Sequence, residues 1–308
     1  MKYPITVLSV ALCPLTARCG EPTQNRKRPS APPLAKLTTY KSSPENIEGT
    51  ILKEEFFDGR GNLVKFVAYD YYGSGEVDGT TTYEYDDAGH KTRQDDGLTV
   101  TTYTYDDQGR LATETWKRGD KGSVEERRYD DRGNLVESRY LDLAGNHDFS
   151  RTYDYTYDAG GRIATAIKWE RYTDGTADMQ MYNIQYMYDA AGRQVEKRSV
   201  NANGSFHNLE RSRYDGRGNL IETLEFDDDP AILSDKNVSQ FNPYGEMVES
   251  RNYSCAGADQ CGDAWSTTTY TYDEYGNSLG YMLRQAHDAD FGERVTIEYR
   301  SPASSATP

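Results

Sequence analysis

Carboxylates are the side chains of this sequence with the clearest capacity for chemistry. Adjacent pairs recur at Asp86-Asp87, Asp106-Asp107 and Asp130-Asp131, and a run of three spans Asp227 to Asp229. A glycosidase needs two carboxylates on opposite sides of the bond that it cleaves, and Ca²⁺ needs several oxygen ligands from one short loop. The pairs recur with a turn motif, and the sequence contains no Asp-x-Asp-x-Asp-Gly stretch. We therefore expect no catalytic residue, no metal site and no cofactor, with an ion at the run of three as the open alternative.

The other residue types that carry chemistry are scattered. The four histidines are His90, His147, His207 and His287, and none forms a His-x-x-x-His pair. The sequence has no Gly-x-Ser-x-Gly nucleophile motif and no phosphate-binding Gly-Lys-Ser/Thr loop. These patterns favour a protein that is not an enzyme. An envelope glycoside hydrolase remains as a rival hypothesis, and it requires a cleft in which carboxylates converge.

The amino-terminal residues are typical of an export signal. An apolar stretch from Ile5 to Leu12 is followed by small residues and then by Cys19. This end resembles a bacterial lipoprotein signal, in which Cys19 becomes the lipidated first residue, so residues 1–19 are the predicted signal peptide. Arg18 departs from that pattern, and cleavage after Ala17 is the alternative. The predicted location is therefore the bacterial cell envelope, as an outer-membrane lipoprotein, or the medium outside the cell.

The remaining cysteines and the tail regions fit an exported chain. Cys255 and Cys261 are separated by five residues, which is enough to close a small disulfide loop in an oxidising compartment. Residues 20–48 are rich in Pro, Ser, Thr, Lys and Arg, and this composition predicts a flexible tether. Residues 301–308 are predicted to be a disordered tail.

The charge of the chain limits the partners that it can bind. The formal net charge is −15 over 308 residues, but residues 1–48 carry +4 and the remainder carries −19. A body this acidic repels phosphate backbones, so the sequence argues against nucleic-acid binding.

A short motif with Asp and Gly three residues apart recurs along the chain. An Asp that opens a turn accepts a hydrogen bond from the backbone two residues on, and Gly suits a position with positive φ. Seven copies begin with Tyr-Asp, and two variants occur at Phe57-Asp58 and Phe241-Asn242. The predicted turn residues are Asp86 and Gly89, Asp106 and Gly109, Asp130 and Gly133, Asp158 and Gly161, Asp189 and Gly192, Asp215 and Gly218, and Asp273 and Gly276.

Tyrosines at alternate positions precede these turns. Tyr83 and Tyr85, or Tyr103 and Tyr105, fall on one face of an extended strand. Asp-Gly or Asn-Gly turns such as Asn203-Gly204 then lead to the next strand. The sequence thus predicts an all-β fold over residues 49–300. We expect an antiparallel meander of about nine tandem β-hairpin repeats and about 18 strands, forming a curled or spiralling sheet rather than a closed barrel.

The repeat resembles that of the YD-repeat or RHS family, as in Tyr103 to Leu111. The resemblance implies a β-hairpin ribbon, which in large secreted or surface-attached bacterial members winds into a shell around a toxin. It also implies glycan binding, which is often suggested for that family. Aromatic side chains outside the motif offer contacts for a ligand, and the candidates are Trp116, Trp169 and Trp265.

These observations favour a non-catalytic scaffold that binds a glycan or a protein partner and reaches the membrane through a lipid anchor at Cys19. The alternative is an accessory or orphan component of an RHS polymorphic-toxin system.

Overall fold

The computed structural model describes residues 29–43, 46–72, 74–257, 261–286 and 290–300. The predicted signal peptide with Cys19, the first part of the predicted tether and the predicted tail at 301–308 lie outside these residues. Within the described ranges the chain consists of strands joined by turns and loops. No helix in this part of the chain is long and apolar enough to cross a membrane.

Twenty strands follow one another along the chain. They are β1 (Leu34–Ser43), β2 (Asn46–Phe57), β3 (Leu63–Tyr69), β4 (Val77–Tyr85), β5 (Lys91–Asp95), β6 (Val100–Tyr105), β7 (Leu111–Arg118), β8 (Lys121–Tyr129), β9 (Leu135–Asp142), β10 (His147–Tyr157), β11 (Ile163–Tyr172), β12 (Met179–Tyr188), β13 (Gln194–Asn201), β14 (Phe206–Tyr214), β15 (Leu220–Asp227), β16 (Asp235–Phe241), β17 (Met247–Ser254), β18 (Ser266–Tyr272), β19 (Ser278–Gln285) and β20 (Phe291–Tyr299).

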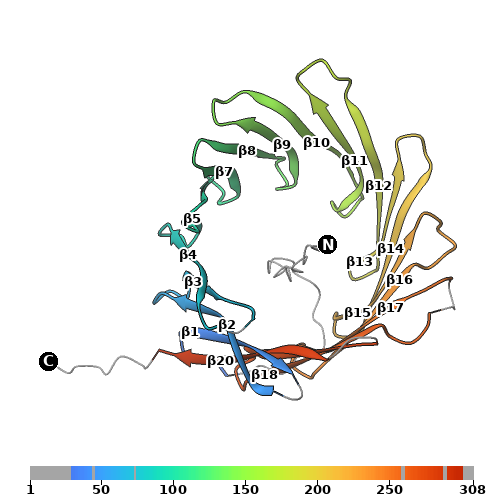
Figure 1. Cartoon of the computed structure of the whole chain (residues 1–308). Helices are drawn as coiled ribbons and strands as arrows, with labels where there is room; N and C mark the ends of the chain where they lie inside the picture. Colours follow the sequence, from blue (N-terminus) through green and yellow to red (C-terminus); the bar gives the residue numbers. More distant parts are fainter. Residues whose placement is uncertain (1–28, 44–45, 73, 258–260, 287–289, 301–308) are drawn as a thin grey trace.

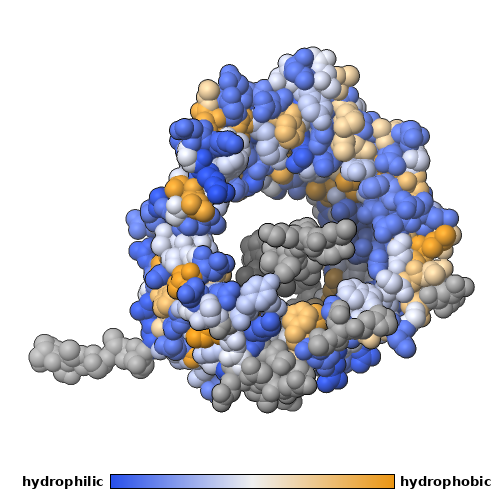
Figure 2. All heavy atoms as spheres, viewed as in Figure 1, coloured by the Kyte–Doolittle hydropathy of each residue, from blue (hydrophilic) through white to orange (hydrophobic). Residues whose placement is uncertain are grey.

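The sheet closes on itself. Each strand pairs antiparallel with the next one, and β20 pairs with β1, from Leu34 opposite Tyr299 to Ser42 opposite Gly292. The first strand, in blue, and the last, in red, therefore lie side by side in Figure 1, and the space-filling view shows a ring that is hollow at its centre (Figure 2). The predicted antiparallel meander is confirmed, but the predicted open, spiralling sheet is wrong because closure satisfies both edge strands.

Strand β1 is the reason for the closure, and it lies in the segment predicted to be a flexible tether. Residues Leu34–Ser43 pair with β2 on one side and with β20 on the other. The segment lacks apolar alternation, yet Thr39 is only 1% exposed. Backbone hydrogen bonds to two neighbours fix this strand, and a composition rich in Thr, Lys and Ser does not reveal them. The tether boundary predicted at residue 48 therefore shifts to before Leu34.

The predicted Asp-Gly turns all lie at one end of the ring, which we call the YD rim. At Asp106 the carboxylate accepts hydrogen bonds from the backbone N–H groups of Gln108 and Arg110, both at 2.9 Å. The Asp106 carbonyl accepts the N–H of Gly109, at 2.9 Å, and this Gly has a φ of +75°. The equivalent Gly has positive φ in all nine motif copies. The other turns lie at the opposite end. We define the opposite rim as nine of them, the connections from β3–β4 to β19–β20.

Tyrosine hydroxyls tie each hairpin to the one before it. The Tyr129 hydroxyl donates to the carbonyl of Leu111, five residues after the Asp of the preceding turn, at 2.9 Å. The same bond, at 2.7 to 2.9 Å, recurs from Tyr85 to Leu63, Tyr105 to Lys91, Tyr155 to Leu135, Tyr188 to Ile163, Tyr214 to Gln194 and Tyr272 to Met247. We call this series the Tyr ladder. It is interrupted where Phe241 takes the place of Tyr.

Arginine adds a second link between neighbouring hairpins. In three turns the residue four after the Asp is Arg, whose Nε donates to the Asp carboxylate at 2.7 Å. The guanidinium then lies over the ring of the next Tyr, with Arg110 4.7 Å from the centroid of Tyr129. The Arg162–Tyr188 and Arg193–Tyr214 pairs repeat this contact at 4.6 and 4.8 Å. Each such Arg pairs with the first Asp of its own turn and packs on the adjacent repeat.

The first prediction concerns the Tyr ladder. Tyr129→Phe removes the hydroxyl and leaves the Leu111 carbonyl without this donor, so we expect the free energy of unfolding to fall by about 1 kcal/mol. Urea-induced unfolding measures the change. The control is Tyr72→Phe, whose side chain is 94% exposed and for which we expect a change within about 0.5 kcal/mol. Equal losses in the two variants would contradict a stabilising role for the ladder.

The second prediction concerns acid. Burial opposes ionisation of Asp130, but hydrogen bonds from the Tyr157 hydroxyl, the Asn134 side chain and two backbone N–H groups outweigh it and lower its pKa from 3.8 to about 2. A depressed pKa in the folded state stabilises the fold above the unfolded value, and this stability is lost as pH falls from about 4 towards 2. Asp130→Asn should flatten this part of the profile of unfolding temperature against pH. Asp131→Asn, at the exposed neighbouring position, is the control.

Candidate binding cleft beside the disulfide loop

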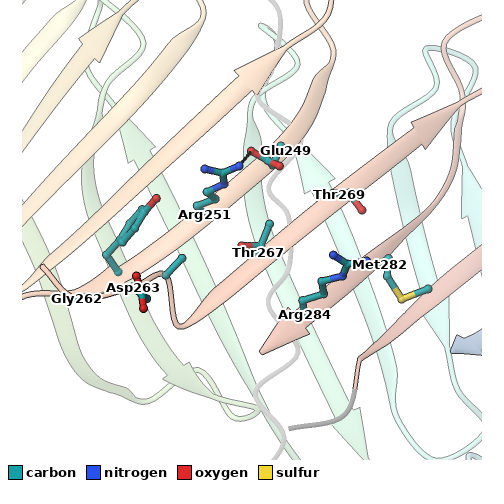
Figure 3. Close-up of a pocket in the computed structure, with 10 residues that line it drawn as sticks. Glu249, Arg251, Gly262, Asp263, Thr267, Thr269, Met282 and Arg284 are labelled. Atoms are coloured by element: carbon teal, nitrogen blue, oxygen red, sulfur yellow. Dashed lines mark ion pairs between the residues drawn. The ribbon is translucent and has the colours of Figure 1, made fainter. Parts of the chain in front are cut away.

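A cavity lies on one face of β17, β18 and β19. Cross-strand pairing sets two rows of side chains on this face: Arg251, Thr267 and Arg284 form the first row. Glu249, Thr269 and Met282 form the second. Side chains directly opposite one another in an antiparallel sheet share a face. Together with Tyr253, two residues further along β17, these rows line a cavity of about 460 Å³ (Figure 3).

The loop between β17 and β18 supplies the remaining wall through Gly262, Asp263 and Ala264. Cys255 and Cys261 form a disulfide with their Cα atoms 4.1 Å apart, at the positions that the sequence predicts. Both half-cystines pack against a buried apolar cluster of Leu209, Phe226 and Leu233. The Cys255 N–H also donates to the Ser234 carbonyl at 2.8 Å. The disulfide thus fastens the loop to the β14–β16 wall and holds it beside the cleft.

Two ion pairs set the electrostatics of the cleft. The Arg251 guanidinium lies 2.9 Å from the Glu249 carboxylate, and Arg284 lies 3.2 Å from Asp290. The hydrogen bond to Glu249, followed by one to Tyr253, raises the pKa of Arg251. Each guanidinium has five N–H donors, and one ion pair uses only part of them. The cleft therefore offers N–H donors, carboxylate acceptors, Thr hydroxyls and one aromatic ring within a single open cavity.

The cleft lies on the outer side of the ring. In Figure 3 the paler green and teal strands of the opposite wall lie behind the strands that carry the labelled side chains. Thr269 and Arg284 are exposed, as expected for a convex face. Tyr270 and Tyr281 pair with each other on the other face of β18 and β19. Following the register around the ring places the alternate tyrosines of the repeats on that same inward face.

A smaller cavity, of about 220 Å³, adjoins the same loop. Asn237 and Asn252 line it, and the Asn237 amide donates to Asn252 at 2.8 Å. Trp265 also lines this cavity, and Tyr253 contributes to both. Burial raises the pKa of Glu225, another lining residue, and the nearby Glu210, Asp227 and Asp235 raise it further.

The three tryptophans predicted as ligand contacts are not brought together. Trp265 is 45% exposed at the smaller cavity. Trp116 lies on β7, and Trp169 lies on β11, where its indole N–H donates to Asp154 at 3.0 Å. Our reading of the sequence missed Arg251, Tyr253 and Arg284. The alternation of Glu249, Arg251 and Tyr253 could have indicated that these three side chains share one face of a strand. Arg284 could not have been added to them from the sequence, because only the pairing of β17, β18 and β19 brings it to the same face. In the described ranges no cluster of His, Cys, Asp and Glu could hold a metal ion.

The third prediction concerns the disulfide. We expect Cys255→Ser/Cys261→Ser to lower the free energy of unfolding by about 2 kcal/mol, because a small closed loop no longer restricts the unfolded chain. Urea-induced unfolding with and without a reductant measures the effect. The reductant should destabilise the wild type and leave the double variant unchanged; a wild type that ignores the reductant would contradict the prediction.

Comparisons with known proteins give fold likenesses at low identity. No family model matches the chain, and no curated protein matches it. A chain of the TcdB2-TccC3-Cdc42 crystal structure is 12% identical with a TM-score of 0.34, covering 76% of this chain and 17% of that one. A chain of the Photorhabdus luminescens Tc holotoxin pore is 11% identical with a TM-score of 0.33, covering 80% and 20%.

A porin-like protein from Bacteroides uniformis is 14% identical with a TM-score of 0.35, covering 89% of this chain and 100% of that one. The chain thus spans about a fifth of the Tc toxin chains that it matches. TM-scores this low establish neither a family nor a function, and the YD-repeat resemblance stays a prediction.

Proposed function

We propose that this chain is a non-catalytic binding module of an exported bacterial protein, and that it binds a short glycan in the cleft on β17–β19. The observation that carries the proposal is the composition of that cleft. A cavity of about 460 Å³ combines the Tyr253 ring with Arg251, Arg284, Asp263 and two threonines. This volume falls within the range typical of small-ligand sites.

The chemistry of these side chains suits a sugar. The apolar face of a pyranose ring packs on an aromatic ring such as that of Tyr253. Adjacent hydroxyls accept from the two guanidiniums and donate to Asp263 or Glu249, which lie on different walls of the cleft. The net charge of −15 disfavours a densely anionic polysaccharide. A neutral or zwitterionic glycan is therefore the class of ligand that we propose.

The proposed location follows from the amino-terminal sequence. The lipoprotein-like signal ending at Cys19 supports attachment to the envelope or release from the cell. A stable disulfide agrees with an oxidising compartment. Processing at Cys19 would leave 15 residues, 19–33, before β1 as the connection to a membrane. Mass spectrometry of the mature protein tests this processing.

A component of a polymorphic-toxin system is the second candidate function. It is supported by the nine YD turns, which share one hydrogen-bond pattern and one rim. A toxin or secretion gene next to the gene for this chain would support this function. The absence of both from the neighbouring genes would contradict it.

The fourth prediction tests the glycan proposal. We expect the wild-type protein to bind at least one glycan on a glycan array. Arg251→Ala or Tyr253→Ala should weaken binding of that glycan about tenfold or more, because each substitution removes a contact with the sugar. Titration calorimetry with the array hit measures the affinity.

The matched control is Arg213→Ala. Arg213 is also exposed on the wall and also forms one ion pair, with Glu222 at 3.2 Å, but it lies on β14 away from the cleft. The affinity of the Arg213→Ala variant for the glycan should stay within about twofold of the wild-type value. An array on which no glycan binds, or equal losses of glycan affinity in Arg213→Ala and Arg251→Ala, would contradict glycan binding in the proposed cleft.

A further inference from the structure

The exposed apolar side chains of the ring gather at the opposite rim. Twelve large apolar residues are exposed among the described ones, and ten of them lie in the turns of that rim or within three residues of them. These ten are Tyr71, Tyr72, Val77, Leu98, Trp116, Leu143, Met179, Ile232, Trp265 and Phe291. Scattered exposed apolar residues are ordinary, but their concentration at one end of a molecule marks an interaction surface.

The same rim is rich in carboxylates. Cations flank its connections at Arg118, Lys121, Arg171 and Arg284, and ion pairs join Arg171 to Asp178 and Arg284 to Asp290. The described residues of its nine connections include no Lys and no Arg. They include the carboxylates of Asp70, Glu76, Asp96, Asp120, Asp174, Asp178, Asp228, Asp229, Asp263 and Asp290. Most of these carboxylates are exposed. The backbone N–H groups of Thr99 and Leu98 donate to Asp96 and lower its pKa, which keeps it ionised.

The YD rim differs in its apolar content. Six of its nine turns contain Arg as well as Asp, and some of these are joined by ion pairs such as Arg110–Asp106 and Arg193–Asp189. Only Met187 and Leu220 are exposed large apolar residues near it. Both described ends of the chain also meet there, where the Arg300 N–H donates to the Pro33 carbonyl at 2.8 Å. The opposite rim is therefore the end of the ring that carries neither end of the described chain.

The combination of apolar and acidic groups selects a class of partner. An anionic lipid surface and a second copy of this rim both carry negative charge, and the carboxylates repel them. A basic protein surface with apolar side chains matches both features, because its Lys and Arg face the carboxylates and its apolar side chains cover the exposed ones. The apolar residues occur in most connections around the ring, so such a partner contacts several hairpins at once.

We propose that the opposite rim is a docking surface for a basic protein partner that presents apolar side chains. Tyr72 and Leu98, the two most exposed of the ten, are the anchors at the β3–β6 end of this surface. Glu76 and Asp78 flank them and supply the charge that attracts the partner. The proposed glycan cleft adjoins this surface at the β17–β18 connection, where Asp263 belongs to both. The anchors lie at other connections, and their test does not depend on sugar binding.

The test uses the whole ring and a defined probe, an amphipathic helical peptide built from Leu and Lys. Peptides built from Leu and Glu, and from Ser and Lys, separate the charge from the apolar contribution. We expect the Leu/Lys peptide to bind, the Leu/Glu peptide not to bind, and the Ser/Lys peptide to bind at least about tenfold more weakly. Hydrogen exchange of the complex should show protection in the opposite-rim connections and not in the YD turns.

Matched variants decide whether the rim is the site. Tyr72→Ser/Val77→Ser/Leu98→Ser should weaken peptide binding about tenfold or more, and Glu76→Gln/Asp78→Asn should weaken it and reduce its salt dependence. Met187→Ser/Leu220→Ser, which removes the exposed apolar residues of the YD rim, should leave the affinity within about twofold of the wild type. Arg251→Ala should also leave it unchanged, which keeps this outcome apart from that of the glycan test.

Three results would overturn the proposal. The first is an equal loss of affinity in the two sets of apolar variants, and the second is protection spread evenly over both rims. The third is binding of phosphatidylcholine vesicles that is abolished by Tyr72→Ser/Val77→Ser/Leu98→Ser, in the absence of peptide binding. That result would assign the rim to a lipid surface instead.

Discussion

The hydrogen bond from a tyrosine hydroxyl to the carbonyl of the preceding repeat governs this structure. A wall one sheet thick buries few side chains, and only six apolar residues are buried among those described. The strands must therefore be held in place by contacts between neighbouring hairpins. The Asp carboxylate fixes each turn, and the turn directs a Tyr such as Tyr129 at a backbone acceptor that no substitution of the Leu111 side chain removes. Because the acceptor is backbone, the repeats tolerate wide variation in sequence while keeping one geometry.

The sequence predicted the hairpins because the chemistry of a turn is local. Asp106 and Gly109 determine their turn within five residues, and alternation at Tyr103 and Tyr105 determines the face. Closure into a barrel is not local. It depends on whether Leu34–Ser43 reaches Phe291–Tyr299, and the composition of the first segment is the same whether it is paired or free. Pairing over so large a separation leaves no trace in either segment alone.

The cleft was hidden from the sequence for a related reason. Arg251 and Arg284 lie on strands that are not adjacent, and Thr267 of β18 lies between them. Only the register of both pairings brings the two guanidiniums to one face. The disulfide could be predicted from the sequence because its two cysteines are only six positions apart. Recognition surfaces on a repeat scaffold thus arise where the repeat departs from its pattern, here in the region from Phe241 to Trp265, where Phe replaces Tyr and the connecting loop lengthens.

The two ends of the described chain lie side by side at one rim, which makes circular permutation of the ring possible. Pro33 and Arg300 meet at the YD rim, and Arg300 donates to the carbonyl of Phe57 at the first repeat turn, so the junction of β20 with β1 occupies the place of a tenth hairpin. A short peptide joining Arg300 to Pro33 would turn the described strands into a continuous circle without moving a strand. New ends could then be opened at another connection, so that a different hairpin comes first along the gene while the order of the hairpins around the ring stays the same.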